Sequence, residues 1–142
     1  MMGILAVIVA APARAALGDQ VASIENDRAK MKATAAVAAK PLYTVHELRL
    51  PYGTVVREYV SSAGLVFAVA WEGPHQPDFK QLLGSYFESY RHAPRSSSLS
   101  RSHATVEQGN LVMHMAGHMR AFFGQAYDPH LLPAGVSVDE IQ

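Results

Sequence analysis

A short segment near the C-terminus concentrates the side chains of this sequence that are best suited to metal chemistry. It holds two histidines, His114 and His118, and three methionines, Met113, Met115 and Met119. Thioether sulfur favours Cu(I) and imidazole accepts Cu(II), so this set of ligands suits copper. The segment therefore predicts copper binding as one candidate function.

Whether both histidines can bind one metal ion depends on the backbone that carries them. If Ala116 and Gly117 form a two-residue turn, as we expect, His114 and His118 lie on opposite faces of a hairpin. If one strand runs through the segment, both lie on the same face. On a helix they would also converge, but Met115 stands where a zinc protease has glutamate, and Gly117 weakens a helix. Methionines that fill core space, with the histidines at the edge, are the structural alternative.

A second group of chemical candidates lies on two strands that we expect to pair. His46 and Glu58 are candidate general acids or bases of a small hydrolase, which would need burial, a shifted pKa and a deep pocket around the hairpin. Glu47 and Arg57 are expected to form an ion pair across the two strands. A solvated face is the alternative interpretation of these charged residues.

The composition excludes several classes of function. The chain has 142 residues, of which 49% are apolar, and this favours one domain. Twelve basic residues balance twelve acidic ones, whereas binding to nucleic acid needs clustered lysine and arginine. The sequence has no cysteine, which excludes disulfides, thiol nucleophiles, thiolate zinc sites and the lipid anchor of a bacterial lipoprotein.

The N-terminus has the pattern of a signal peptide. An apolar run over 3–11 precedes Ala13-Arg14-Ala15, a small-x-small pattern that suits signal peptidase. We expect a signal peptide at 1–15 with cleavage after Ala15, and therefore a protein of the periplasm or one that is secreted. The run is shorter than the roughly 20 residues that span a bilayer, so no transmembrane segment is expected. A buried N-terminal strand is the alternative.

The middle of the chain predicts strands followed by a helix. The segments 43–50 and 54–60 are rich in β-branched and aromatic residues and flank a turn, which predicts a hairpin. The segment 65–71 is apolar on both faces and predicts a central strand. Apolar residues from Phe79 to Tyr90 recur at helical spacing and predict one long helix.

The remaining segments complete the expected fold. A shorter helix is expected near the N-terminus of the mature chain, and the alanine-rich 33–39 is ambiguous between helix and strand. The segment 91–103 has five serines and three arginines and predicts a flexible loop. Further strands are expected at 104–107, 111–115 and 118–127. Three arginines of the loop form a possible interaction surface for an acidic partner: Arg91, Arg95 and Arg101.

The fold class that follows is α+β, as one domain at 16–142. We expect a mainly antiparallel sheet of five to six strands, with one long helix packed on it and the shorter N-terminal helix beside it.

Four segments of the sequence resemble a known family. They are 43–48 (YTVHEL), 53–59 (GTVVREY), 64–74 (GLVFAVAWEGP) and 117–122 (GHMRAF). Together they resemble a family of small exported bacterial proteins that is catalogued as domain of unknown function 2844. The likeness covers most of the mature chain but departs at Tyr52, where Asn or Asp is more usual. It implies export and a shared fold, and it brings no activity, cofactor or catalytic residue.

Three hypotheses for function follow. The first is a non-enzymatic, periplasmic domain that binds another protein or a component of the cell envelope through a sheet edge or the 91–103 loop. The second is periplasmic copper binding at His114, His118 and the nearby methionines. The third is a small hydrolase that uses His46 or Glu58.

Overall fold

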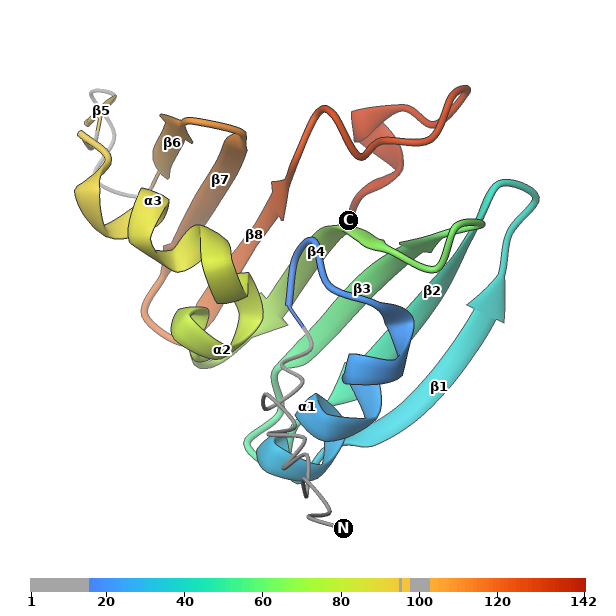
Figure 1. Cartoon of the computed structure of the whole chain (residues 1–142). Helices are drawn as coiled ribbons and strands as arrows, with labels where there is room; N and C mark the ends of the chain where they lie inside the picture. The colour runs from blue at the N-terminus through green and yellow to red at the C-terminus, as the bar shows by residue number, and fades with distance from the viewer. Residues whose placement is uncertain (1–15, 95, 98–102) are drawn as a thin grey trace, which may run out of the picture.

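One antiparallel sheet organises the whole fold (Figure 1). The structure is a computed structural model that describes residues 16–94, 96–97 and 103–142, so the expected signal peptide at 1–15 lies outside the described residues. In spatial order the strands are β1 (Thr34–Ala39), β2 (Tyr43–Arg49), β3 (Val55–Ser61), β4 (Val66–Gly73), β8 (Ala121–Tyr127), β7 (Leu111–His118), β6 (His103–Gln108) and the two-residue β5 (Ser96–Ser97).

The α+β class and the antiparallel sheet are confirmed, but the sheet is larger than expected. Within the described residues it has seven strands of six to eight residues in addition to β5, where we expected five to six. The main addition is β1, the alanine-rich segment. Alanine has no strong preference for strands. The segment is extended because it pairs with β2 over the whole length of β1.

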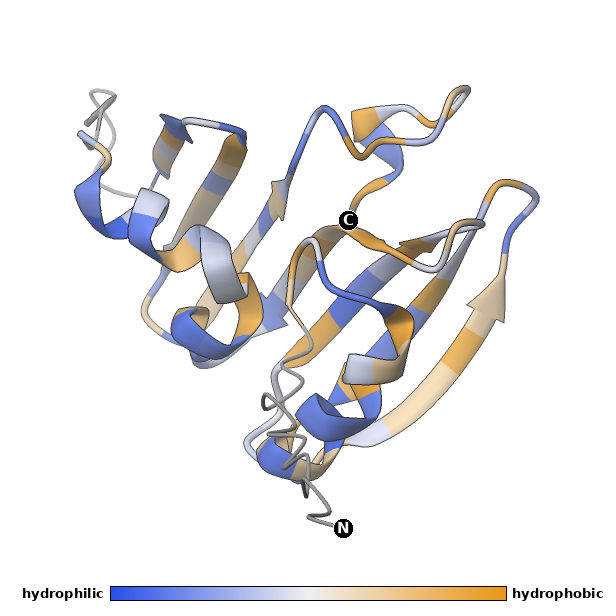
Figure 2. Ribbon diagram, viewed as in Figure 1, coloured by the Kyte–Doolittle hydropathy of each residue, from blue (hydrophilic) through white to orange (hydrophobic). Residues whose placement is uncertain are grey.

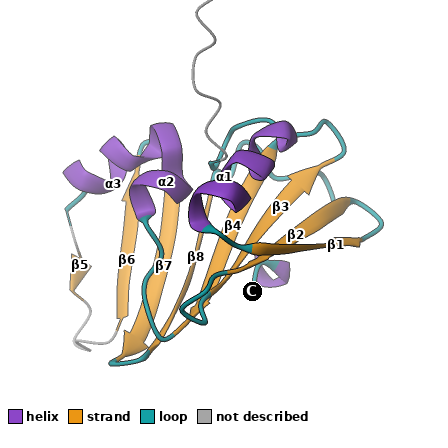
Figure 3. Ribbon diagram, turned by 90° about the horizontal axis from the view of Figure 1, so that it is seen from below, coloured by secondary structure: helices purple, strands orange, loops and turns teal. Residues whose placement is uncertain are grey.

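The helices cover one face of the sheet (Figure 3). The N-terminal helix consists of a 3-10 turn, η1 (Val21–Ser23), and α1 (Ile24–Met31). The expected long helix is a series of three short elements: α2 (Phe79–Leu83), η2 (Gly84–Tyr86) and α3 (Phe87–His92). The side chain of Asp78 accepts hydrogen bonds from the backbone N–H groups of Lys80 and Gln81 and so caps α2.

The interruption at Gly84 has a packing cause. Its φ angle is +52°, and a Cβ atom at this position would lie 2.3 Å from the Cβ of Ala16. Only glycine tolerates both the conformation and the close approach. The segment at Ala16 therefore packs directly against the middle of the helical series.

The opposite face of the sheet is covered by the end of the chain. The segment 128–142 contains only one short helix, η3 (Val138–Glu140), whose N-terminus is a capping box between Ser137 and Glu140. Apolar residues of this segment pack on a cluster that includes Tyr59, Phe67 and Tyr127. The sheet therefore separates two hydrophobic cores, a larger one under the helices and a smaller one under the C-terminal segment.

Other expectations are confirmed in part. The hairpin of β2 and β3 forms, and β4 lies near the centre of the sheet between β3 and β8. Within the expected loop at 91–103, α3 extends through His92, Ser96–Ser97 form β5 and β6 begins at His103, while residues 95 and 98–102 lie outside the described residues. No helix in the described part of the chain is long and apolar enough to cross a membrane.

Candidate functional site

The candidate copper ligands do not converge on one point. The predicted turn at Ala116 and Gly117 is wrong, because β7 runs unbroken from Leu111 to His118. Instead, Gly117 allows β7 to approach β8 closely, because a Cβ atom at this position would lie 2.5 Å from the backbone oxygen of Ala121. The hairpin turn is formed by Met119 and Arg120, the latter with a φ of +66°.

The two histidines share a face of β7, but they are four residues apart in an extended strand. At about 3.3 Å per residue, their Cα atoms are about 13 Å apart, too far for one metal ion. Met113 is fully buried in the core under the helices, and Met115 packs against the same core. Met119 is 91% exposed at the hairpin turn. Among the described residues no group of three or more His, Cys, Asp or Glu side chains could hold a metal ion.

Glu58 has two of the properties that acid–base chemistry requires, but it has no access to solvent. Its side chain is fully buried on the helix-covered face of β3, and neither carboxylate oxygen has a hydrogen-bond partner among the described residues. Burial, together with the charge of Asp27 on α1, raises the pKa of Glu58 to about 8. His46 lies directly opposite on β2, and burial lowers the pKa of its imidazole. The interpretation of Glu58 as part of a solvated face is therefore wrong.

The face of the sheet opposite the helices carries two grooves, one on each side of the last residues of the chain. The first has a volume of about 640 Å³ and extends from β1 across β2 and β3 to the wall formed by Asp139, Glu140 and Gln142. The second has a volume of about 400 Å³ and lies over β6, β7 and β8, beside Ile141 and Gln142. His114 lines this second groove, where its Nδ1 lies 3.3 Å from the hydroxyl of Thr105.

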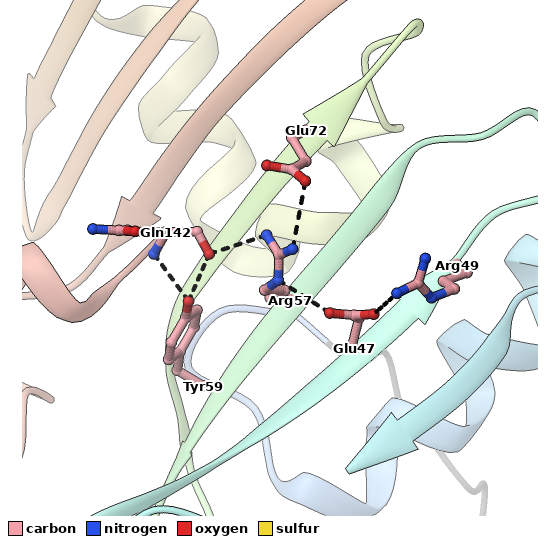
Figure 4. A network of polar contacts seen from close by, with 6 residues as sticks. All are labelled: Glu47, Arg49, Arg57, Tyr59, Glu72 and Gln142. Atoms are coloured by element: carbon pink, nitrogen blue, oxygen red, sulfur yellow. Dashed lines mark hydrogen bonds and ion pairs between the residues drawn. The ribbon is translucent and has the colours of Figure 1, made fainter. Parts of the chain in front are cut away.

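A polar network at the inner end of the first groove fixes the last residue of the chain (Figure 4). Arg57 is its centre: its guanidinium lies 3.2 Å from the carboxylate of Glu47 and 3.5 Å from that of Glu72, and it donates to the backbone oxygen of Gln142 at 3.2 Å. The pair of Glu47 and Arg57 confirms the cross-strand expectation. The hydroxyl of Tyr59 donates to the oxygen of Gln142 at 2.8 Å and accepts from its N–H at 2.9 Å.

The floor of the first groove changes character from one row of residues to the next. Strand pairing places Ala36, Glu47 and Arg57 in one row across β1, β2 and β3. The neighbouring row on the same face consists of Ala38, Val45 and Tyr59. One row is therefore charged and the other is largely apolar. Both begin at β1 with a methyl side chain, which leaves the groove open toward the edge of the sheet.

The edge at β1 is open as well. All six residues of β1 are exposed, and among the described strands only β2 pairs with it. Val37 at its middle is 62% exposed. The strand has no charged residue and no proline, and Figure 2 shows its largely apolar colouring at the margin of the sheet. The opposite margin is the two-residue β5.

Of the three arginines that we expected as an interaction surface, the structure describes Arg91. Arg91 belongs to α3, where its guanidinium lies 3.0 Å from the carboxylate of Glu88. Arg95 and Arg101 lie outside the described residues.

Sequence reasoning missed the strand β1 and both grooves. Two signals for β1 were present: the segment lacks charged residues, and it directly precedes an expected hairpin. The grooves depend on where 128–142 packs, and this segment has no periodicity that predicts its position.

Comparison with known proteins identifies a family and no function. The model of a family described as "Protein of unknown function (DUF2844)" matches residues 13–141. No curated protein and no solved structure matches the chain. Because the match covers nearly the whole sequence, the chain belongs to the DUF2844 family.

Proposed function

We propose that the protein is an exported, non-enzymatic binding domain of the cell envelope, and that it binds an extended segment of a partner protein at the free edge of β1. The observation that carries this proposal is that all six residues of β1 are exposed. An edge strand presents unpaired backbone N–H and C=O groups, with which a strand from another chain can pair.

The contrast between the two margins of the sheet supports this choice of surface. Natural proteins protect free edges with charged side chains, proline, bulges or very short strands. The margin at β5 is very short, whereas β1 has six residues, and its small side chains offer no obstacle to a further strand. The first groove begins beside Ala36 and Ala38, so it would accept side chains of a paired segment.

Site-specific crosslinking in cells tests the binding proposal. The photoreactive residue p-benzoylphenylalanine is placed at Val37 in the full chain, and at the exposed Met119 as the control. We expect a discrete adduct from Val37 and none from Met119, with peptide mapping that locates the crosslink in an extended segment of the partner. Equal labelling from both positions, or no adduct from Val37, would contradict binding at β1.

Cell fractionation tests export separately. We expect the protein in the periplasmic fraction, with an intact mass that corresponds to cleavage after Ala15. Protein of full mass in the cytoplasmic fraction would contradict export while leaving the β1 surface to be judged by crosslinking.

A further inference from the structure

The contact between α1 and the sheet contains two carboxyl groups where apolar side chains are expected. Three side chains of α1 face the core: Ile24, Asp27 and Met31, at positions i, i+3 and i+7. Asp27 is fully buried, and so is Glu58, which lies between Val56 and Val60 on the same face of β3. Lys, Glu, Arg and Asp are rarely buried to this degree unless they are paired.

The surroundings of Glu58 provide little to compensate a second negative charge. In the part of the chain that the structure describes, both of its oxygens are buried without a hydrogen-bond partner. Asp27 accepts a hydrogen bond from the side-chain amide of Gln81 on α2, which is neutral. The residues directly opposite Glu58 are His46 on β2 and Val69 on β4. Burial lowers the pKa of His46, so its imidazole is neutral in alkaline solution.

Asp27 and Glu58 are both fully buried, and the charge of Asp27 acts on Glu58. Two such carboxylates cannot both be ionised without a large cost. A proton bound to one of them removes the charge repulsion and most of the desolvation cost. We propose that a proton held by the Asp27–Glu58 pair latches α1 onto the sheet, so that loss of this proton in mildly alkaline solution releases the helix.

The sign of the pH dependence follows from the raised pKa of Glu58. In the released form Glu58 lies in water and loses its proton above about pH 4.5. In the latched form the buried carboxyl group keeps this proton to a higher pH. Between about pH 4.5 and the pKa of about 8 in the latched form, each pH unit therefore favours release by up to about tenfold. Above about pH 8 both forms are ionised, and the dependence ends.

The latch also has a consequence for the binding surface, and this extension rests on the proposed function. Only Lys32, in a left-handed conformation with a φ of 53°, and Ala33 separate the end of α1 from the start of β1. Release of α1 therefore frees the N-terminal end of the edge strand. A protonated latch would hold β1 in the form that pairs with a partner.

Hydrogen exchange of the full chain, measured by mass spectrometry from pH 5 to 9 and corrected for intrinsic rates, tests the latch. We expect the opening equilibrium of the α1 amides to increase by up to about tenfold per pH unit and to level off above about pH 8. Glu58→Gln should abolish this increase. The matched control is Glu72→Gln, which neutralises an exposed carboxylate on β4 and should leave the increase unchanged.

Asp27→Asn provides a second variant should Glu58→Gln not fold. Without the charge of Asp27 the pKa of Glu58 falls, so the increase should level off at a lower pH than in the unmodified protein. If Asp27 had a purely structural role, Asp27→Asn would not change the pH at which the increase levels off. Exchange of α1 that is independent of pH in the unmodified protein, or unaffected by Glu58→Gln, overturns the proposal.

Two further results separate the alternatives. If Ca²⁺ suppresses opening above pH 8 in the unmodified protein and not in Glu58→Gln, a cation rather than a proton neutralises the pair, and the proton latch is wrong. If the latch is found but the Val37 adduct forms equally at pH 6 and pH 9, the coupling to β1 is wrong. If no adduct forms at any pH, the proposed function fails, while hydrogen exchange still decides the latch.

Discussion

The attachment of Gln142 to the sheet gives a prediction that the structure makes quantitative. Tyr59→Phe removes one hydroxyl that makes two hydrogen bonds, one to the backbone oxygen and one to the backbone N–H of Gln142. Each such bond contributes about 1 kcal/mol net. The phenyl ring retains the packing of Tyr59, which is 3% exposed. We therefore expect a loss of about 1–2 kcal/mol in the free energy of unfolding, the lower value if Gln142 becomes hydrated.

The assay is urea denaturation followed by far-ultraviolet circular dichroism. The slope of the free energy of unfolding against urea concentration should be the same in all variants, which checks two-state behaviour. The matched control is Tyr43→Phe. The ring of Tyr43 lies 5.8 Å from that of Tyr59. Within the described residues its hydroxyl makes a single hydrogen bond, 3.0 Å to the exposed carboxylate of Glu140. We expect a smaller loss for this variant. A Tyr59→Phe variant no less stable than Tyr43→Phe would refute the reasoning that the network of Figure 4 fixes the end of the chain.

Three further predictions concern β7 and its neighbours. Met113→Ala should cost about 2–5 kcal/mol in urea denaturation because it leaves a cavity in the core, whereas Met119→Ala should cost less than about 0.5 kcal/mol. Gly124→Ala should lower the melting temperature, because a Cβ there would lie 2.5 Å from the ring of the adjacent tryptophan and 2.6 Å from a backbone oxygen of β7. In Cu(II) titrations, we expect that no single tight site is lost in both His114→Ala and His118→Ala, because one ion cannot reach both imidazoles. Loss of the same tight site in both variants would contradict the strand geometry.

The parts of the fold that the sequence predicts are those whose signal is local. Alternating and continuous apolar runs mark β2, β3 and β4, and the helical spacing from Phe79 marks the face that packs on the sheet. The extent of β1 could not be predicted in this way, since alanine suits either conformation and only the neighbouring strand decides. The placement of 128–142 depends on contacts with residues far away in the sequence, such as the bonds from Tyr59 to Gln142.

The candidate site was less predictable than the fold. Gly117 suggests a turn, but in the structure it allows β7 and β8 to approach each other closely. The sequence alone does not distinguish these two roles of glycine. Glu58 was misleading because its charge indicates a solvated face. Its position between Val56 and Val60, both buried on the core face, was the signal that identified its true environment.

The single tryptophan of the sequence gives the protein a built-in optical probe of one of its two cores. The ring of Trp71 lies against Gly124 of β8, and its centroid is 5.1 Å from that of Phe79 at the start of α2. Its environment is therefore set by the docking of α2 on the central strands, and 128–142 lies on the other side of the sheet. Tryptophan emission will report detachment of α2 more strongly than detachment of the C-terminal segment, so a difference between emission and the exchange of Ile141 would reveal that the two layers separate independently.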